Sequence, residues 1–268
     1  TFTEEAARHY NPLATLEPLS SIYKVALAVT KSETDEGVVP IENSLEGSVT
    51  DTLDILIRQD NLFIRSELVL PIEHCLLISD NLSESNIQVI YSHPQALGQC
   101  RQFLEDRFPN AHLVASLSTA AAVIDMRESK SPAAAIATHR AAQLNDANVL
   151  IQSIQDNPSN VTRFVVLSKS DHPPTGADKT SLCFSFAEDK PGLLHSVLSQ
   201  FAHHDINLAK VESRPTKQSL GEYIFLIDVH GHRKDPPVMQ AIQFLQEASS
   251  MLKVFGSYPR WDQPAQSR

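Results

Sequence analysis

One stretch of the chain, SKSDHPPTGADK at Ser168–Lys179, most strongly limits the folds that this sequence can adopt. It holds two prolines, a glycine and charges of both signs, and its residues follow no helical or strand period. Such a stretch is typical of a linker, so the residues on either side of it are expected to form separate domains. We therefore predict a first domain at residues 1–170, a linker at 171–179 and a second domain at 180–262.

Short apolar runs alternate with amphipathic stretches in the first domain, which predicts an α/β domain with mainly parallel strands. The expected strands are Val25–Val29, Gly37–Ile41, Cys75–Ser79, Val89–Ser92, Leu113–Ser116, Ala134–Ala137 and Phe164–Leu167. The expected helices are Thr50–Arg58, Pro94–Arg107 and Ser118–Arg127. A further helix is expected to open at Thr1, because Thr1 and Glu4 have the spacing of a capping box. A chain that begins on a helix cap is expected to lack a strand and a turn that preceded it.

The pattern of the second domain predicts the order β-α-β-β-α-β, which is the ferredoxin-like arrangement. The expected strands are Thr180–Ala187, Ile206–Arg214, Glu222–Val229 and Leu252–Ser257, with a turn around Lys217–Gly221. The expected helices are Gly192–His204 and Val238–Ala248. Their apolar residues recur at helical spacing, so each helix is expected to bury one side.

Charge and cysteine usage limit the class of function. The formal net charge of -10 argues against a nucleic-acid binder, which would present a basic face. It leaves room for an anionic substrate, because a few cations in a cleft can outweigh a distant negative surface. The three cysteines, Cys75, Cys100 and Cys183, lie in apolar runs and are interpreted as buried thiols without a disulfide. We find no zinc-type spacing, signal peptide or membrane-spanning run, so we expect no metal and a cytoplasmic protein.

Four segments of the first domain place hydroxyl and amide side chains where a strand ends or a helix begins. They are Val39–Ser44 with Glu46–Ser48, Ser92–Leu97 with Gln99-Cys100, Ser118–Ala121, and Asn160–Phe164. Ligands bind at such strand ends in open α/β sheets, and the free N–H groups of helix starts suit anions. Each segment also has a purely structural interpretation. Asn43, Ser92 and Ser118 fit helix caps, and Arg163 fits a surface charge on a strand.

Together these segments resemble prephenate dehydratase over essentially the whole chain. The stretches PIENS with EGSV, SHPQAL and TRF follow one another at Pro40–Val49, Ser92–Leu97 and Thr162–Phe164. The second domain resembles the ACT domain of the same family at Asp189–Gly192, Glu212–Pro215, Leu220–Tyr223 and Gly256–Pro259. The resemblance implies a bilobal α/β catalytic domain like a type II periplasmic binding protein, with its site between the lobes. It also implies a ferredoxin-like βαββαβ ACT domain.

The resemblance implies a carbon–oxygen lyase of phenylalanine biosynthesis that converts prephenate to phenylpyruvate without a metal or cofactor. Carried over residue by residue, the substrate-binding residues are Asn43, Ser44, Ser92, Gln99, Ser118, Thr119 and Arg163. Thr162 is the expected catalytic residue, because its hydroxyl can donate a proton or a hydrogen bond to the leaving ring oxygen. Arg163 is expected to hold a carboxylate through two parallel hydrogen bonds. A positioned water or His93 remains an alternative proton donor.

The resemblance also implies regulation by phenylalanine, which binds in the seam between two paired ACT domains. The expected effector-binding residues are Asp189, Gly192, Leu193, Asn207, Leu208, Glu212, Ser213 and Arg214. The helix start at Gly192 offers N–H groups to the carboxylate of the amino acid, and Asn207 offers an acceptor to its ammonium. The protein is expected to form a homodimer or homotetramer through its ACT and catalytic domains.

Two other functions remain open on the sequence. Arogenate dehydratase is one, since no motif here distinguishes an amine from a keto group in the substrate. A non-catalytic solute-binding protein joined to an amino-acid sensor is the other. The joint occurrence of TRF, PIENS and SHPQ argues against it, because binding alone would not require these motifs.

Overall fold

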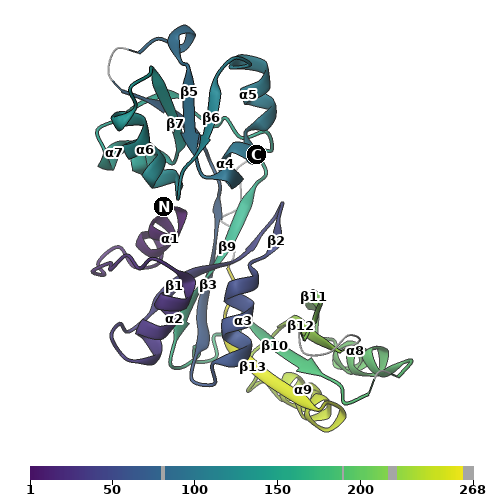
Figure 1. The fold of residues 1–268 in the computed structure, drawn as a ribbon. Helices are drawn as coiled ribbons and strands as arrows, with labels where there is room; N and C mark the ends of the chain where they lie inside the picture. Colours follow the sequence, from purple (N-terminus) through teal and green to yellow (C-terminus); the bar gives the residue numbers. More distant parts are fainter. Residues whose placement is uncertain (80–81, 189, 217–221, 262–268) are drawn as a thin grey trace. The chain divides into compact units, whose positions relative to one another are not determined.

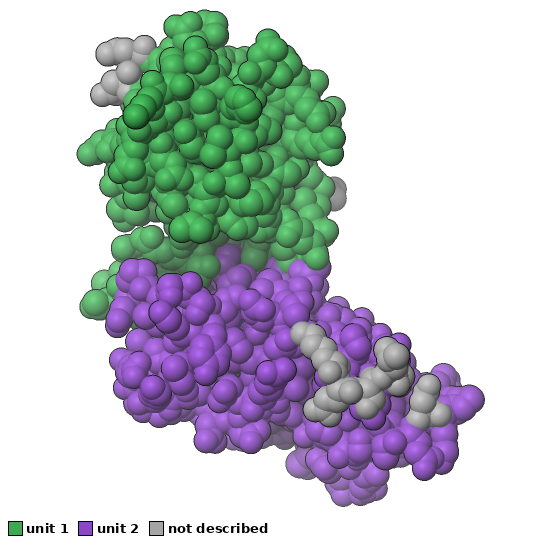
Figure 2. Space-filling view, in the orientation of Figure 1, with its two compact units in different colours: residues 1–16, 43–46, 70–162 green, residues 17–42, 47–69, 163–268 purple. Residues whose placement is uncertain are grey.

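The computed structural model describes residues 1–79, 82–188, 190–216 and 222–261, with the elements shown in Figure 1. Two compact units make up the chain (Figure 2). The first unit is Thr1–Leu16, Asn43–Glu46 and Leu70–Thr162, and the second is Glu17–Glu42, Gly47–Val69 and Arg163–Arg268. The division falls inside three strands, β1 (Gly37–Asn43), β3 (Phe63–Pro71) and β9 (Val161–Ser168). The second unit therefore combines the predicted second domain with part of the first, and the predicted domain boundaries stay a prediction.

A five-stranded sheet in the order β6-β5-β7-β4-β8 forms the centre of the first unit. Its strands are β4 (Cys75–Ile78), β5 (Val89–Ser92), β6 (His112–Ala115), β7 (Ala133–Ala137) and β8 (Asn148–Ile151). Strand β5 pairs in parallel with β6 and β7, whereas β4 runs antiparallel to β7 and β8. The prediction of mainly parallel strands is therefore wrong for β4 alone among these five strands, because β8, which is antiparallel to β4, runs in the same direction as β5, β6 and β7.

The helices of the first unit are α1 (Phe2–Tyr10), η1 (Glu84–Asn86), α4 (Pro94–Gln99), α5 (Arg101–Arg107), α6 (Thr119–Glu128) and α7 (His139–Leu144). The single helix predicted at Pro94–Arg107 is wrong, because the chain leaves helical geometry at Cys100. There the carboxylate of Asp156 accepts hydrogen bonds from the N–H groups of Gln102 and Phe103, at 2.9 and 3.1 Å. A residue distant in sequence thus caps α5, which no local pattern announces.

Two four-stranded sheets form the second unit. One has the order β2-β1-β9-β3, with β2 at Gly47–Ser48, and is accompanied by α2 (Ile22–Thr30) and α3 (Thr50–Arg58). The other has the order β11-β12-β10-β13 and belongs to the predicted second domain. Its elements are β10 (Asp178–Ser185), α8 (Leu193–His203), β11 (Leu208–Pro215), β12 (Tyr223–His230), α9 (Pro236–Ala248) and β13 (Met251–Pro259). The ferredoxin-like order is confirmed, and the turn predicted at Lys217–Gly221 lies outside the described residues.

Two helix starts illustrate how capping decides local structure. The predicted cap at Thr1 is confirmed, since its side chain accepts from the N–H of Glu4 at 3.2 Å. The strand predicted at Val25–Val29 is wrong, because these residues lie in α2. The side chain of Ser21 accepts from the N–H of Lys24 at 3.2 Å and opens that helix. A short apolar run without a clear period fits either element, and here the cap decides.

The two sheets of the second unit share one hydrophobic core. It joins residues of α2, α3, β1, β3 and β9 to residues of the second-domain sheet, and the latter are Cys183, Leu226, Phe255 and Tyr258. Gly256 of β13 has a φ of 148°, and a Cβ there would overlap the backbone of Ile64 in β3. Only glycine permits this approach. Because side chains alternate along a strand, the opposite face of the second-domain sheet packs on α8 and α9.

All three cysteines are buried free thiols, as predicted. Burial raises the pKa of both Cys100 and Cys183 to about 12, so both stay protonated at neutral pH. Among the described residues, no helix has the length and apolar character needed to cross a membrane. The same part of the chain contains no group of three or more His, Cys, Asp or Glu side chains suited to a metal ion.

Candidate functional site

Asn43 and Thr162 form a buried hydrogen-bonded pair in the first unit. Asn43 ends β1, Thr162 lies near the start of β9, and the two side chains are 7% and 8% exposed. Asn43 Oδ1 accepts from the N–H groups of Leu45 and Glu46, so its amide nitrogen must point the other way. Asn43 Nδ2 then donates to Thr162 Oγ1 at 2.9 Å and to Asn160 Oδ1 at 2.7 Å. Because this bond uses a lone pair of Thr162, the hydroxyl proton is available to a second partner.

Ser44 fastens the segment after β1 to the start of β9. Its N–H donates to the carbonyl of Val161 at 2.9 Å, and its Oγ accepts from the N–H of Val161 at 3.0 Å. This pairing keeps the Asn43–Thr162 pair in register. In the structure the Ser44 side chain contacts the backbone of β9. Substrate binding by Ser44 stays a prediction.

Gln99, at the end of α4, is oriented by two groups of the first unit that the sequence analysis did not assign. Its Nε2 donates to Glu46 Oε1 at 3.0 Å, and its Oε1 faces His74 Nε2 at 2.9 Å. Burial lowers the pKa of His74, and the hydrogen bond to Gln99 opposes this shift. The imidazole is therefore neutral at pH 7, and because it faces an oxygen, its proton lies on Nε2. A single histidine between Glu73 and Cys75 carries no sequence signal for this role.

The predicted residues Ser92, Ser118 and Thr119 gather at one edge of the five-stranded sheet. Ser92 ends β5, where it pairs with the last residue of the parallel strand β6, and α6 begins shortly after β6. Ser92 Oγ donates to the carbonyl of Ile136 at 2.7 Å, so it ties two strands rather than capping a helix. Ser118 caps α6 by accepting from the N–H of Ala121 at 3.0 Å, which confirms that structural interpretation. Thr119 is the first residue of α6, among its free N–H groups.

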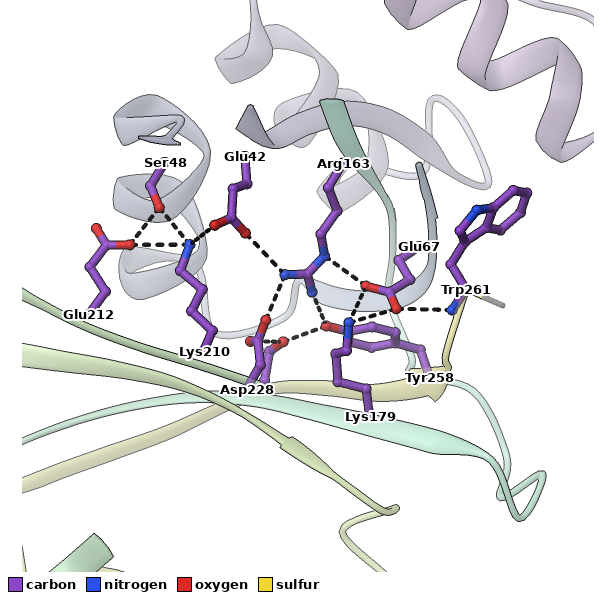
Figure 3. Close-up of polar contacts among 11 residues, drawn as sticks. Glu42, Ser48, Glu67, Arg163, Lys179, Lys210, Glu212, Asp228, Tyr258 and Trp261 are labelled. Atoms are coloured by element: carbon purple, nitrogen blue, oxygen red, sulfur yellow. Dashed lines mark hydrogen bonds and ion pairs between the residues drawn. The ribbon is translucent and has the colours of Figure 1, made fainter. Parts of the chain in front are cut away.

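Arg163 lies in the second unit, where protein groups occupy its guanidinium (Figure 3). Its Nε donates to Glu67 Oε2 at 2.7 Å, its Nη1 to Asp228 Oδ2 at 2.6 Å, and its Nη2 to the Tyr258 hydroxyl at 2.7 Å. Burial by itself would lower the pKa of Arg163, but Tyr258, Asp228 and Glu67 together raise it well above its usual value. The guanidinium is therefore charged, and each of its nitrogens donates to a protein group. Its predicted role in holding a substrate carboxylate stays a prediction.

The structure separates the predicted effector residues into two groups. Glu212 of β11 forms a hydrogen bond with Ser48 of β2, and Arg214 of β11 forms one with Asp54 of α3. Ser213 lies between them on the opposite face and is exposed. Asp189 lies outside the described residues.

The remaining predicted effector residues lie around α8 and the start of β11. Gly192 has a φ of 89° and precedes α8, which begins with Leu193. Asn207 is exposed, and Leu208 opens β11. The exposed members of the set, Gly192, Asn207 and Ser213, are therefore accessible in this chain. Their role in binding an effector stays a prediction.

This combination defines a two-part α/β protein, with hydroxyl and amide groups gathered in its first unit and a ferredoxin-like domain at its end. The chain matches the family model for prephenate dehydratase over residues 1–172 and that for the ACT domain over residues 182–247. The chain therefore belongs to the prephenate dehydratase family and carries an ACT domain.

Two of the similar proteins are named for the same family, and a third is described differently. A bifunctional chorismate mutase/prephenate dehydratase of Aquifex aeolicus is 41% identical over 262 residues, which cover 97% of this chain and 71% of that protein. The crystal structure of a prephenate dehydratase of Arthrobacter aurescens in complex with L-Phe matches with a TM-score of 0.87 and 40% identity, covering 99% and 89% of the two chains. A structure described as a novel type of quorum quenching acylase, GqqA, matches with a TM-score of 0.86 and 29% identity, covering 97% and 94%.

Proposed function

We propose that this chain is a carbon–oxygen lyase that converts prephenate to phenylpyruvate and is regulated by phenylalanine at its ACT domain. The observation that carries the proposal is the Asn43–Thr162 pair, which leaves the Thr162 hydroxyl proton available to a leaving oxygen. The chemistry asks for little more, because loss of carbon dioxide and a ring hydroxyl makes the ring aromatic. Action in the cytoplasm as a homodimer or homotetramer stays a prediction.

In the proposed reaction, the bond to the departing carboxylate breaks and its electrons enter the ring as the ring C–O bond breaks. The leaving oxygen takes a proton from Thr162, directly or through a bound water, and departs as water. Solvent then returns a proton to Thr162. General-acid assistance of this kind contributes roughly 10²–10⁴ in rate. His93 remains an alternative donor, and its Nδ1 accepts from the N–H of Gln95 at the start of α4.

Substrate orientation falls to polar groups of the first unit, which are Ser44, Ser92, Gln99, Ser118 and Thr119. The first turn of α6 offers free N–H groups to a carboxylate beside Ser118. Orientation of a bound substrate contributes several kcal/mol to lowering a barrier. Arg163 has weaker support as a carboxylate ligand, because all of its guanidinium nitrogens already bind protein acceptors.

The deciding experiment is ultraviolet detection of phenylpyruvate formed from prephenate by the purified chain, with arogenate tested beside it. We expect turnover of prephenate and a lower kcat/KM for arogenate. A higher kcat/KM for arogenate would replace the proposal with the runner-up, arogenate dehydratase. Absence of turnover on both substrates would favour a non-catalytic binding protein.

Replacement of His74 is expected to disturb substrate binding through Gln99. His74→Leu removes the donor that orients the Gln99 amide, so we expect KM for prephenate to rise up to about tenfold with a smaller change in kcat. His74→Gln is the matched control, since its amide nitrogen can replace Nε2, and it should keep KM near that of the wild type. Steady-state kinetics at neutral pH test this. Equal KM values for the leucine variant and the wild type would remove His74 from the site.

Phenylalanine is expected to inhibit turnover and to raise the melting temperature. An effector that binds only the folded protein stabilises it by about 2.7 kcal/mol at a hundred times its Kd. Ser213→Ala should weaken both responses about tenfold in phenylalanine concentration while leaving unliganded turnover unchanged. The structure makes Ser213 a cleaner choice than Arg214, whose side chain also pairs with Asp54. Ser199→Ala on α8 is the control, and a response to millimolar phenylalanine equal in both variants would contradict the effector assignment.

A further inference from the structure

A ring of hydrogen bonds in the second unit joins Arg163 to three strands of the ACT sheet. Arg163 Nη1 donates to Asp228 of β12, and Nη2 donates to the hydroxyl of Tyr258 in β13. Ser181 of β10 closes the ring, since its Oγ bonds the Tyr258 hydroxyl and lies 2.5 Å from Asp228 Oδ1. Figure 3 shows the Arg163 side chain pointing from β9 toward this sheet.

The direction of each hydrogen bond in the ring is determined. A carboxylate only accepts, so Ser181 must donate its one hydroxyl proton to Asp228. Tyr258 therefore donates to Ser181 and accepts from Arg163. Burial, opposed by Arg163, raises the pKa of Tyr258 well above its usual value, so its hydroxyl keeps the proton that this order requires. Each hydroxyl of the ring therefore donates to one partner and accepts from another, and this order fixes the position of the guanidinium.

A second carboxylate holds Arg163 from the other side. Glu67 of β3 accepts from Arg163 Nε at 2.7 Å and from Lys179 Nζ at 2.8 Å, and its side chain is 2% exposed. Two cations, Arg163 and Lys179, thus face two anions, Glu67 and Asp228. Such a buried set is balanced in charge, so removal of any one member leaves an uncompensated charge.

A branch of the same network reaches β11. Arg163 Nη1 lies 3.5 Å from Glu42 Oε2, and Glu42 Oε1 lies 3.2 Å from Lys210 Nζ. Lys210 in turn contacts Glu212 at 3.2 Å and Ser48 at 2.6 Å. The branch therefore ends at Glu212 of the predicted effector motif.

Two of the catalytic-domain members of the network adjoin the candidate site in the chain. Arg163 follows Thr162, and Glu42 precedes Asn43. Successive side chains of a strand point to opposite faces, so Arg163 reaches the ACT sheet while Thr162 faces the other way, toward Asn43. Any shift of the Arg163 backbone must move the backbone of Thr162 with it.

We propose that Arg163 is a positioning residue, which the ACT sheet holds through Asp228 and Tyr258 so that Thr162 keeps its hydrogen bond with Asn43. The inference rests on the proposed function. It also gives the ACT domain a physical route to the site, because any movement of β11, β12 or β13 on effector binding changes the hold on Arg163 or Glu42. An effector alters activity through such a route only if it binds the two arrangements with different affinity.

Two variants that touch neither substrate nor effector test the proposal in the full-length chain. Asp228→Asn removes the charge that binds Nη1, and Tyr258→Phe removes the acceptor of Nη2 with little change in shape. For both we expect kcat on prephenate to fall about tenfold while KM stays within about twofold, since small misplacement of a reacting group is costly. Phenylalanine should still bind by calorimetry, yet inhibit each variant less than it inhibits the wild type.

Asp171→Asn is the matched control. Asp171 is a partly buried aspartate of the same unit, paired with Arg233 at 2.9 Å and bonded to the N–H of Ser257. In the described part of the chain its side chain bonds Arg233 and Ser257 but neither β1 nor β9, so its loss should lower stability while kcat and inhibition remain those of the wild type. A fall in kcat and inhibition equal to that of Asp228→Asn would make the effect a general one and overturn the proposal.

Arg163→Lys separates positioning from substrate binding. Lysine keeps the charge but not the planar fork. Positioning predicts that Arg163→Lys lowers kcat as Asp228→Asn does, and that the double variant is no worse than either single one. The proposal would be overturned if KM rose in Arg163→Lys alone while Tyr258→Phe kept the kcat and the phenylalanine inhibition of the wild type. If Asp228→Asn fails to fold, the kinetics of Tyr258→Phe alone test the proposal. A wild-type protein without activity on prephenate would instead refute the proposed function.

Discussion

Thr162→Val is expected to lower kcat on prephenate by roughly a factor of 10² or more, with a much smaller change in KM. Valine keeps the branched shape of the side chain and removes only the hydroxyl, which is the group that Asn43 holds at 2.9 Å. In the proposed mechanism, the hydroxyl assists the leaving oxygen in the transition state and contributes little to ground-state binding. Steady-state and single-turnover kinetics of the purified variant give both constants.

Thr52→Val is the matched control for this substitution. Thr52 is a buried threonine of α3 whose hydroxyl donates to the carbonyl of Pro40 at 2.6 Å. Its loss should cost about 1 kcal/mol of stability, as expected for one hydrogen bond, and leave kcat within about twofold. Normal turnover by Thr162→Val would reduce Thr162 to a strand residue and favour His93 or another donor.

Glu67→Gln is expected to destabilise the protein by about 3–5 kcal/mol, because it removes the buried carboxylate that both Arg163 and Lys179 contact. The substitution keeps the size of the side chain, so the loss reports charge. Urea unfolding followed by circular dichroism measures it, with the midpoint compared at constant slope. Asp60→Asn is the control, since Asp60 forms a 3.3 Å ion pair with Lys253 but is 93% exposed, and exposed pairs contribute about 0–1 kcal/mol. Equal losses in the two variants would contradict the role assigned to Glu67.

The same network gives an acid dependence with a definite sign. Burial alone would raise the pKa of Asp228, but Arg163 and the hydrogen bond from Ser181 lower it below the usual value. A depressed folded-state pKa means that the stabilisation is complete above the unfolded pKa of about 3.9 and is lost as the pH falls through the folded value. Asp228→Asn should therefore unfold with a weaker dependence on pH in this acid range than the wild type does.

Most elements could be predicted from local patterns, and the misses have identifiable causes. The run at Val25–Val29 fits a strand or a helix equally well, and the Ser21 cap decides for the helix. Strands β2, β3 and β8 and helices η1 and α7 were not predicted. The break at Cys100 depends on Asp156, which lies far along the chain. A regular spacing of apolar residues indicates that one face of a segment is buried. This signal is weakest where a segment is buried on several sides.

For the candidate site, motif order and the family resemblance led to the family, but not to every role. Thr162 and Arg163 are neighbours in one motif, which suggested that both serve the substrate. Strand alternation already argued otherwise, since two successive side chains cannot face the same site. His74 and Glu46 were missed because neither has a periodic or motif signal that points to Gln99.

The sequence by itself determined the α/β and βαββαβ patterns and the residue types of the candidate site. These depend on local periodicity, caps and turn chemistry, which neighbouring residues carry. Only the tertiary structure decided which side chains pair: Arg163 with Glu67, 96 positions apart, and Asn43 with Thr162, 119 positions apart. Such contacts depend on strand order and on the face that each residue presents, and one sequence leaves no local trace of either. That is why Arg163, which the family motif places beside the predicted catalytic threonine, contacts the ACT sheet.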